Sequence, residues 1–414
     1  MTRTRNVSVA AVASCALALG ALSACAPPSS STGAGSGSAA ASEPIVIGAS
    51  VPLSGPLAGF GSFLKWGYTH AAAEVNAAGG LSVGGVKRKV DLRIVDDKTD
   101  PNQVTTNIKT LISSDKAIAL LGSCTPDLVN PGALVADQSK IPFVAGCNPL
   151  EVFTSVKKWT WAWDIFFSVP ELSKLSFDTM SGLGLATNKK VAILHDNGPD
   201  GQAVGREIWP AIAAASGYEV VVNVEFPVDN TDFSAAVQKA KDSGADILLV
   251  DSVTPQAISL RKQMAAVGWT PKVMVNEKGA EPVQYAEALG TLADGVMVGA
   301  YWDPSFPFKG AKELQAAWEK DNPGKTSSQH IADSYTAAMV LMDAIAAAGS
   351  TDATAVNAAI AKTDKEYPVG PVKFAADHTA KISVVNSQWQ GGKPVMVYPK
   401  DRATGSVLFP MPAK

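Results

Sequence analysis

Residues 90–121, VDLRIVDDKTDPNQVTTNIKTLISSDKAIALL, contain one complete structural unit. Val90–Val95 is rich in β-branched and apolar residues and predicts a buried strand. Asp100 and Pro101 then predict a helix start, because a carboxylate caps free backbone N–H groups and proline suits the first helical position. One apolar face follows at helical spacing, at Val104, Ile108, Leu111 and Ile112. Ile118–Leu121 predicts the next strand, so the unit is strand, helix, strand.

The same alternation continues along the chain. Further strands are predicted at Ile45–Ala49, Pro142–Ala145, Val191–Leu194, Glu219–Val224, Ile247–Val250, Val273–Val275 and Gly295–Ala300. The helical patterns between them end at glycines such as Gly79 and Gly244. Pro210 falls where a helix should be running and is expected to kink or divide it. Continuous apolar strands separated by helices are typical of a parallel sheet covered on both faces, which makes the fold class α/β.

An internal similarity suggests two units of one design. Residues 104–123 and 233–252 each contain a helix, a short turn and a strand that ends in a small polar pair. About 370 residues follow residue 42, which favours two domains. Ligands of open α/β sheets bind outside the carboxyl ends of the strands. The strand ends here are small and polar, at Pro52–Gly55, Ser123–Thr125, Gly146–Asn148, His195–Asn197, Asp251–Ser252 and Asn276–Glu277.

The N-terminus predicts export. Arg3 and Arg5 precede an uncharged, Ala/Leu/Val-rich stretch, Val7–Leu22, which has the length and small closing residues of a secretory signal. Leu22–Cys25, LSAC, resembles the bacterial lipobox, so residues 1–24 are predicted to be a lipoprotein signal peptide and Cys25 to carry lipid. The alternative is a plain signal peptide cut nearby. Residues 25–42 lack charges and large apolar side chains and predict a flexible tether.

Charge and length limit the partners. The 35 basic residues include Arg3 and Arg5, so the exported chain keeps 33 against 38 acidic residues, a net charge near −5. The charges are scattered without a basic stripe, which argues against nucleic acid as a partner. No segment after the signal peptide is expected to be long and apolar enough to cross a bilayer.

Two cysteines remain in the body of the chain, Cys124 and Cys147. Each lies just past a predicted strand, and two neighbouring parallel strands are about 4.8 Å apart. Their ends are then close enough for a disulfide, which an oxidising compartment permits. The alternative is a pair of buried free thiols. If bridged, the two residues stiffen the mouth of the ligand site.

A search for catalytic groups finds no convergent set. The four histidines, His70, His195, His330 and His378, are dispersed, and none has a partner at metal-ligand spacing. No G-x-S-x-G elbow, P-loop or H-E-x-x-H occurs. Asp96 and Asp97 with Asp100 are better explained as a strand end and a helix cap than as a metal cluster. The sequence therefore predicts neither enzyme chemistry, nor a metal, nor a cofactor.

With strand ends and helix caps in place, the body resembles the branched-chain amino-acid type of periplasmic binding protein, the type I solute-binding family that serves ABC importers. The matching segments occur in family order, at Ile45–Gly48 with Pro52–Pro56, Glu74–Gly80, Asp96–Asp97 with Asp100–Pro101, Leu121–Ser123, Val191–Asp196, Asp232–Ser234, Gly244–Asp246 and Gly370–Phe374.

The resemblance implies two doubly wound parallel-sheet lobes joined by three crossing segments, near Asp164, Trp302 and Val385. Lobe 1 would comprise residues 43–164 and 303–384, and lobe 2 residues 165–302 and 385–414. The family closes on its ligand by a hinge. One lobe holds a carboxylate with backbone N–H groups and a hydroxyl, and the other contributes an acid that meets an ammonium.

When the family's site positions are carried over one residue at a time, the resemblance assigns site residues at the strand ends. Phe60 matches an aromatic at the loop after the first strand. The carboxylate-binding loop is matched by Ser123, Cys124 and Thr125, with Thr125 supplying the hydroxyl. Cys147 and Asn148 match the next loop, where backbone groups receive the ligand. Glu277 matches the acid that meets the ammonium, although a solvated strand-end carboxylate is an equal alternative.

Two positions in the second lobe depart from the family. Asp200 stands where the family often has tyrosine, and Val253, beside the ligand-side Ser252, is another such position. Both reduce aromatic closure over the ligand, so its identity stays open. An aromatic group, Trp159, Trp161, Trp163, Phe166 and Phe167, precedes the first crossing. Its alternation is more typical of core or inter-lobe packing than of ligand stacking.

These observations predict a monomeric, lipid-anchored solute-binding protein on the outer face of the cytoplasmic membrane. It would capture an amino acid or a related small solute and deliver it to an ABC permease. A ligand sensor on the same fold, reporting to a membrane receptor, is the alternative. Both use the same lobe closure, so the sequence does not separate them.

Overall fold

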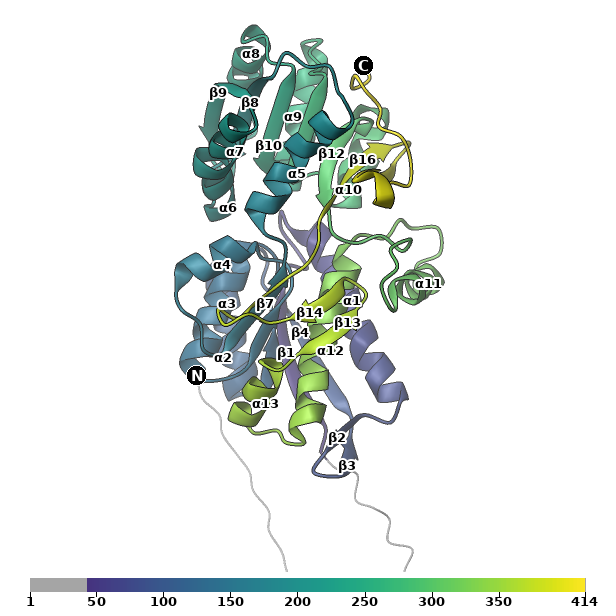
Figure 1. The fold of residues 1–414 in the computed structure, drawn as a ribbon. Coiled ribbons are helices and arrows are strands. Elements are labelled where there is room, and N and C mark those ends of the chain that lie inside the picture. The colour runs from purple at the N-terminus through teal and green to yellow at the C-terminus, as the bar shows by residue number, and fades with distance from the viewer. Residues whose placement is uncertain (1–42, 414) are drawn as a thin grey trace, which may run out of the picture. The chain divides into compact units, whose positions relative to one another are not determined.

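The computed structural model describes residues 43–413. Two large sheets organise this part of the chain (Figure 1). The predictions for Cys25 and for residues 1–42 lie outside the described residues. We use lobe 1 for the part built on the six-stranded sheet and lobe 2 for the part built on the seven-stranded sheet.

The sheet of lobe 1 has the order β15-β7-β6-β5-β1-β4, and every pair is parallel. Its strands are β1 (Ile45–Val51), β4 (Val90–Asp96), β5 (Ala119–Leu121), β6 (Phe143–Ala145), β7 (Ala162–Phe166) and β15 (Thr379–Lys381). Its helices are α1 (Ala58–Ala77), α2 (Pro101–Ser113), α3 (Pro126–Ser139), α4 (Leu150–Val156), α12 (His330–Ala348) and α13 (Ala353–Ile360). Two hairpins, β2 (Leu81–Val83) with β3 (Val86–Arg88) and β13 (Asp364–Tyr367) with β14 (Gly370–Lys373), and α11 (Ala311–Asp321) complete this part of the chain.

The sheet of lobe 2 has the order β17-β16-β12-β11-β10-β8-β9. Five strands are parallel, β8 (Lys190–Asp196), β9 (Glu219–Phe226), β10 (Ile247–Ser252), β11 (Val273–Lys278) and β12 (Val296–Ala300). The last two, β16 (Val385–Gln390) and β17 (Lys393–Tyr398), run antiparallel. The helices are α5 (Val169–Gly182), α6 (Pro199–Gln202), α7 (Trp209–Ala215), α8 (Ser234–Asp242), α9 (Thr254–Ala266) and α10 (Val283–Leu289), with 3₁₀ turns at Gly290–Ala293 and Lys400–Arg402.

The predicted strands and helix ends are confirmed. All nine strands are present, with ends shifted by a few residues. Asp100 caps α2, its side chain accepting a hydrogen bond from the Asn102 N–H. Gly79 and Gly244 take left-handed φ values of 99° and 67° just beyond α1 and α8. Pro210 also divides its helix as expected, because a π-helical turn, Ala203–Ile208, joins α6 to α7.

The chain passes between the two sheets three times. The passages follow β7, β12 and β15, and the third leads directly into β16. Asp164 lies inside β7, so the first passage comes after Phe166. Trp302 follows β12 at the second passage, and Val385 begins β16 at the third.

Helix α12 differs from the sequence expectation about membrane spans. It has 19 residues and a mean hydropathy of 1.3, which meets the length and composition of a spanning helix among the described residues. However, 72% of it is buried inside the fold. It packs on α1 so closely that a Cβ on Gly67 would lie 2.0 Å from the Ser334 hydroxyl. Its apolar character therefore serves the core of lobe 1.

Two of the tryptophans before the first passage, Trp159 and Trp163, also belong to that core, whereas Trp161 is half-buried. Trp159 stacks on Phe153 at 4.8 Å, and Trp163 stacks on His378 at 3.6 Å. Trp163 also donates its indole N–H to Asn357. These rings are used in packing, as the alternation favoured.

Candidate functional site

The carboxyl ends of β8, β10 and β11 bring one lysine and three aspartates together. The Lys278 ammonium lies 2.8 Å from Asp251 Oδ1, 2.9 Å from Asp196 Oδ2 and 3.7 Å from Asp200 Oδ2. The register accounts for the contacts with Asp251 and Asp196. Strand β10 lies between β11 and β8, and its Asp251 pairs with Glu277 and with His195, the residues just before Lys278 and Asp196. Lys278 has a left-handed φ of 57°, which turns the end of β11. The four side chains form a buried group that we call the lysine cluster.

Burial and charge act against each other within the lysine cluster. Burial alone would lower the pKa of Lys278, but the carboxylates of Asp251, Asp196 and Asp200 together raise it well above its usual range. Burial also raises the pKa of Asp200 to about 6, although the nearby ammonium opposes this. Burial raises the pKa of Asp251 well above its ordinary value for the same reason. The ammonium is therefore the charge that keeps the three carboxylates inside the protein.

Glu277 lies next to the lysine cluster but outside it. Glu277 pairs with Asp251 in the register of β11 and β10, but its carboxylate makes no ion pair with Lys278 among the described residues. Glu277 Oε2 accepts a hydrogen bond of 3.2 Å from the Gly299 N–H, and the described residues offer this carboxylate no other hydrogen bond. Only 8% of the residue is exposed. Burial, with the negative charges of Glu281 and Asp200, raises the pKa of Glu277 to about 8.

A cavity of about 30 Å³ is lined by these acids together with apolar side chains. Its polar lining is Asp200, Asp251, Glu277, Lys278, Glu281 and Ser173, and its apolar lining is Pro149, Phe167, Val169, Leu172, Val204 and Trp209. Pro149 belongs to the loop before α4 in lobe 1, whereas most of the lining belongs to lobe 2. A space of this size holds about two water molecules. A larger solute therefore needs the lobes or the lining side chains to move apart.

An ion pair joins the lobes beside this cavity. His330, at the start of α12 in lobe 1, donates through Nε2 to Glu281 Oε2 in lobe 2 at 2.9 Å. Its Nδ1 donates to Asp333 Oδ2 at 2.8 Å. The Tyr301 hydroxyl donates to Asp333, and the Phe60 ring meets the His330 ring edge-on at 4.9 Å. Burial alone would lower the pKa of His330, but Asp333 and Glu281 raise it to about 9.

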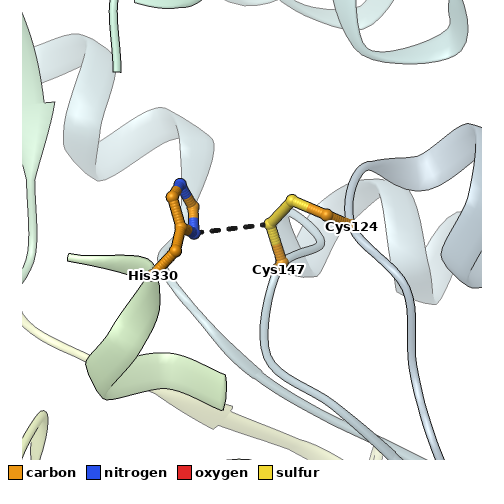
Figure 2. A group of neighbouring side chains, drawn as sticks. All are labelled: Cys124, Cys147 and His330. Atoms are coloured by element: carbon orange, nitrogen blue, oxygen red, sulfur yellow. Dashed lines mark hydrogen bonds between the residues drawn. A yellow bond between two sulfur atoms is a disulfide. The ribbon is translucent and has the colours of Figure 1, made fainter. Parts of the chain in front are cut away.

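The predicted disulfide is confirmed, since Cys124 and Cys147 are bonded with their Cα atoms 4.8 Å apart. Figure 2 shows His330 directed at this bridge, with Nδ1 3.7 Å from Cys147 Sγ. Two sulfurs and an imidazole within 4.8 Å resemble a metal-ligand set. The sulfurs, however, are bonded to each other, and both ring nitrogens of His330 donate to carboxylates. The group is better described as a disulfide packed against an imidazolium.

The structure places the predicted site residues in three settings. Asp200 and Glu277 line the cavity, while Phe60 and Cys147 contact His330 at its edge. The Ser123 hydroxyl donates to Asp97 at 2.7 Å, so it is engaged within lobe 1. Buried polar atoms without a described partner are Thr125 Oγ1, Asn148 Oδ1 and Ser252 Oγ. None of the residues of this last group lines the cavity.

Sequence reasoning missed Lys278, Glu281 and His330. Lys278 was passed over because Glu277 was taken as the last residue of its strand, whereas β11 runs one residue further. His330 was counted among dispersed histidines, although Asp333 stands three residues away on one helix face, at the spacing of a helical ion pair. The partnership with Glu281 joins residues 49 apart and has no local signal.

The His330 ion pair predicts a specific pH dependence of stability. A group whose pKa is higher in the folded state stabilises the fold fully below its unfolded pKa, about 6.5 for histidine. That stabilisation is lost as pH rises through the folded pKa of about 9. Replacing His330 by glutamine is therefore expected to lower the free energy of unfolding clearly near pH 6.5 and much less near pH 9.5.

Denaturant unfolding at the two pH values measures this difference. His70→Gln is the matched control, because the His70 ring stacks on Trp66 and has no carboxylate partner among the described residues. A difference between wild type and His330→Gln that stays constant with pH would contradict the prediction.

Comparison with known proteins identifies close similarities over nearly the whole body. The sequence profile of the periplasmic binding protein family matches residues 44–393. A Leu/Ile/Val-binding protein homologue of Brucella melitensis is 25% identical over 390 residues, covering 89% of this chain and 95% of the relative. A second homologue, from Brucella abortus, is 26% identical over 392 residues, covering 89% and 94%.

Solved structures share the fold. The leucine-binding protein LivK of Thermotoga maritima has a TM-score of 0.76 at 22% identity, covering 86% of this chain and 99% of its own. A solute-binding protein of an ABC transporter from R. palustris, solved with benzoate, has a TM-score of 0.75 at 20% identity, covering 90% and 98%. At these identities the likeness shows the fold alone.

Proposed function

The chain belongs to the periplasmic binding protein family, as a type I member of the branched-chain amino-acid transporter group, and we propose that it captures a small solute outside the cytoplasm for an ABC importer. The solute is an amino acid or a related compound. It is held between lobe 1 and lobe 2, whose predicted boundary after residue 164 moves to the end of β7 at Phe166. The protein carries out no chemistry on it and passes it to a membrane permease.

The Glu277 carboxylate carries this proposal. It is more than nine-tenths buried, lines the cavity beside the passages between lobes, and has one hydrogen bond where a carboxylate can accept several. A buried carboxylate with unused acceptors costs free energy unless a partner meets it. A solute ammonium is such a partner, and it would favour the ionised form of Glu277.

Lobe closure supports the same proposal. The His330–Glu281 ion pair and the Pro149 wall bring lobe 1 against the acids of lobe 2, and the remaining cavity is too small to admit a solute through a closed mouth. Three crossing segments allow the lobes to separate and close as rigid bodies. Binding from an open state would then exclude water from both ends of the solute.

Solute binding is tested by thermal unfolding of the full chain in the presence of amino acids, amines, amides and aromatic acids, one compound at a time. A solute that binds only the folded state adds about 2.7 kcal/mol of stability at 100 times its Kd. With the solute so found, Glu277→Gln is expected to lower affinity at least tenfold, about 1.4 kcal/mol, because it keeps the shape and removes the charge.

The melting temperature of Glu277→Gln without solute should stay at or above that of the wild type, because a buried charge has been removed. If calorimetry finds that Glu277→Gln binds the solute as tightly as the wild type, Glu277 does not contact the solute. A panel in which nothing stabilises the protein would contradict capture itself.

We propose further that Cys25 anchors the protein to the outer face of the cytoplasmic membrane and that the anchored protein works as a monomer. The support is the sequence Leu22–Cys25 and the tether of residues 25–42. Mass spectrometry of protein extracted from its native membrane should find a mature chain that starts at an acylated Cys25. An unlipidated start well downstream would contradict the anchor.

A further inference from the structure

The charges that line the cavity do not balance. Four carboxylates face it, from Asp200, Asp251, Glu277 and Glu281, whereas Lys278 is the one cation among its described lining residues. Its ammonium is already shared by three aspartates. The imidazolium of His330 is shared in the same way, by Glu281 and Asp333. Among the described residues at this cavity, no cation is left to meet a solute carboxylate.

The loop expected to hold a carboxylate does not reach the cavity, because Ser123, Cys124 and Thr125 are all absent from its lining. Two of the loop's donors are also engaged within lobe 1. The Ser123 hydroxyl donates to Asp97, and the Thr125 N–H donates to the Cys147 carbonyl at 2.8 Å. A zwitterionic amino acid would therefore find a partner for its ammonium and a poor one for its carboxylate.

The remaining lining suits the body of an organic cation. Phe167, Leu172, Val204 and Trp209 give the cavity an apolar and partly aromatic lining beside the acids, and aromatic faces attract cations. Glu277 supplies a buried carboxylate with unused acceptors. Resting on the proposed function of this site, we propose that its solute is an organic cation without a carboxylate, a protonated amine or guanidinium on an apolar body.

The affinity of the site for an organic cation should depend on pH, because binding is linked to the ionisation of the surrounding acids. The titratable groups around the site are Glu277 and Lys278 on β11, Asp251 on β10, Asp196 on β8, Asp200 on α6, Asp127 on α3, Glu281 after β11 and His330 on α12. Burial raises the pKa of Glu277 to about 8 and that of Asp200 to about 6. A bound cation favours the ionised form of both, so its affinity rises with pH through this range. A carboxylate solute would show the opposite slope.

Calorimetry and thermal unfolding of the full chain in detergent, with matched compounds, test the inference. Each set contains an amino acid, its decarboxylated amine and its deaminated acid: leucine with isoamylamine and isocaproate, phenylalanine with phenethylamine and hydrocinnamate, and arginine with agmatine and 5-guanidinovalerate. At least one amine is expected to bind at least tenfold more tightly than its parent amino acid, a difference of about 1.4 kcal/mol. Its affinity should increase severalfold from about pH 6.5 to about pH 8.5.

The Asp200→Asn variant should weaken binding of that amine, whereas Asp178→Asn, which breaks an exposed ion pair on α5, should leave it unchanged. Tighter binding of the amino acid or of the deaminated acid would overturn the inference and leave solute capture standing. If no compound of any class binds, the inference and the proposed function both fail. Binding of the amine with no response to pH would also overturn the inference, since the acids would then not contact it.

Discussion

A Lys278→Met variant is expected to lose about 3–5 kcal/mol of unfolding free energy, because it leaves buried carboxylates without their cation. The Lys278 ammonium is the described partner that the carboxylates of Asp196, Asp200 and Asp251 share. Methionine fills much of the same volume, so the loss should come mainly from charge. Equilibrium denaturation near pH 7.5 measures it.

The matched control is Lys174→Met, which removes an exposed i,i+4 pair with Asp178. Pairs of that kind contribute about 0.3–0.5 kcal/mol. Adding Asp200→Asn and Asp251→Asn to Lys278→Met should restore much of the lost stability, since the uncompensated charges are then removed. Lowering the pH below about 6 should also reduce the difference in unfolding free energy between Lys278→Met and wild type, because Asp200 becomes protonated there. A loss no larger than that of Lys174→Met would show that the lysine cluster is hydrated in solution.

The double variant Cys124→Ser/Cys147→Ser is expected to lose about 3 kcal/mol, the chain-entropy value for closing a loop of this length. The bridge spans 23 residues and ties the ends of β5 and β6 together. Because Cys147 packs against His330, loss of the bridge should also loosen the ion pair between lobes. Reductant should destabilise the wild type by a similar amount.

Denaturant unfolding with and without reductant separates the bridge from the side chains. The double variant itself is the control, since reductant should no longer change its stability. Alkylation of unfolded, unreduced protein should leave Cys124 and Cys147 unlabelled. Labelling of both, or equal stability of wild type with and without reductant, would contradict the prediction.

The sequence was informative where structure depends on local chemistry. Apolar runs located the nine predicted strands, and Asp100 and Pro101 located the start of α2. Strands β16 and β17 were missed for a physical reason. Asn386, Ser387 and Gln388 are buried in β16 and each donates a side-chain hydrogen bond, so polar residues interrupt the apolar pattern of this strand. Hydrophobicity finds only the strands that bury apolar side chains.

The site was less predictable because it depends on register and on distant contacts. A one-residue difference in where β11 ends decides whether Glu277 or Lys278 joins the three aspartates. The His330–Glu281 pair depends on how two lobes meet, which no spacing within the sequence encodes. The disulfide was predictable because neighbouring parallel strands bring their ends together whatever the lobes do.

The order in which the sheets are completed has a consequence for folding kinetics. The parallel strands of lobe 2, β8 to β12, come from one continuous stretch, so this sheet core is able to nucleate from nearby segments. Lobe 1 is different, because β15 closes on β7 through contacts such as His378 with Ala162, 216 residues apart. Non-local closure of this kind is slow. A chain that emerges N-terminus first therefore holds β7 as an unpaired edge until nearly all of it has been exported, and this interval is when we expect misfolding and chaperone dependence to be greatest.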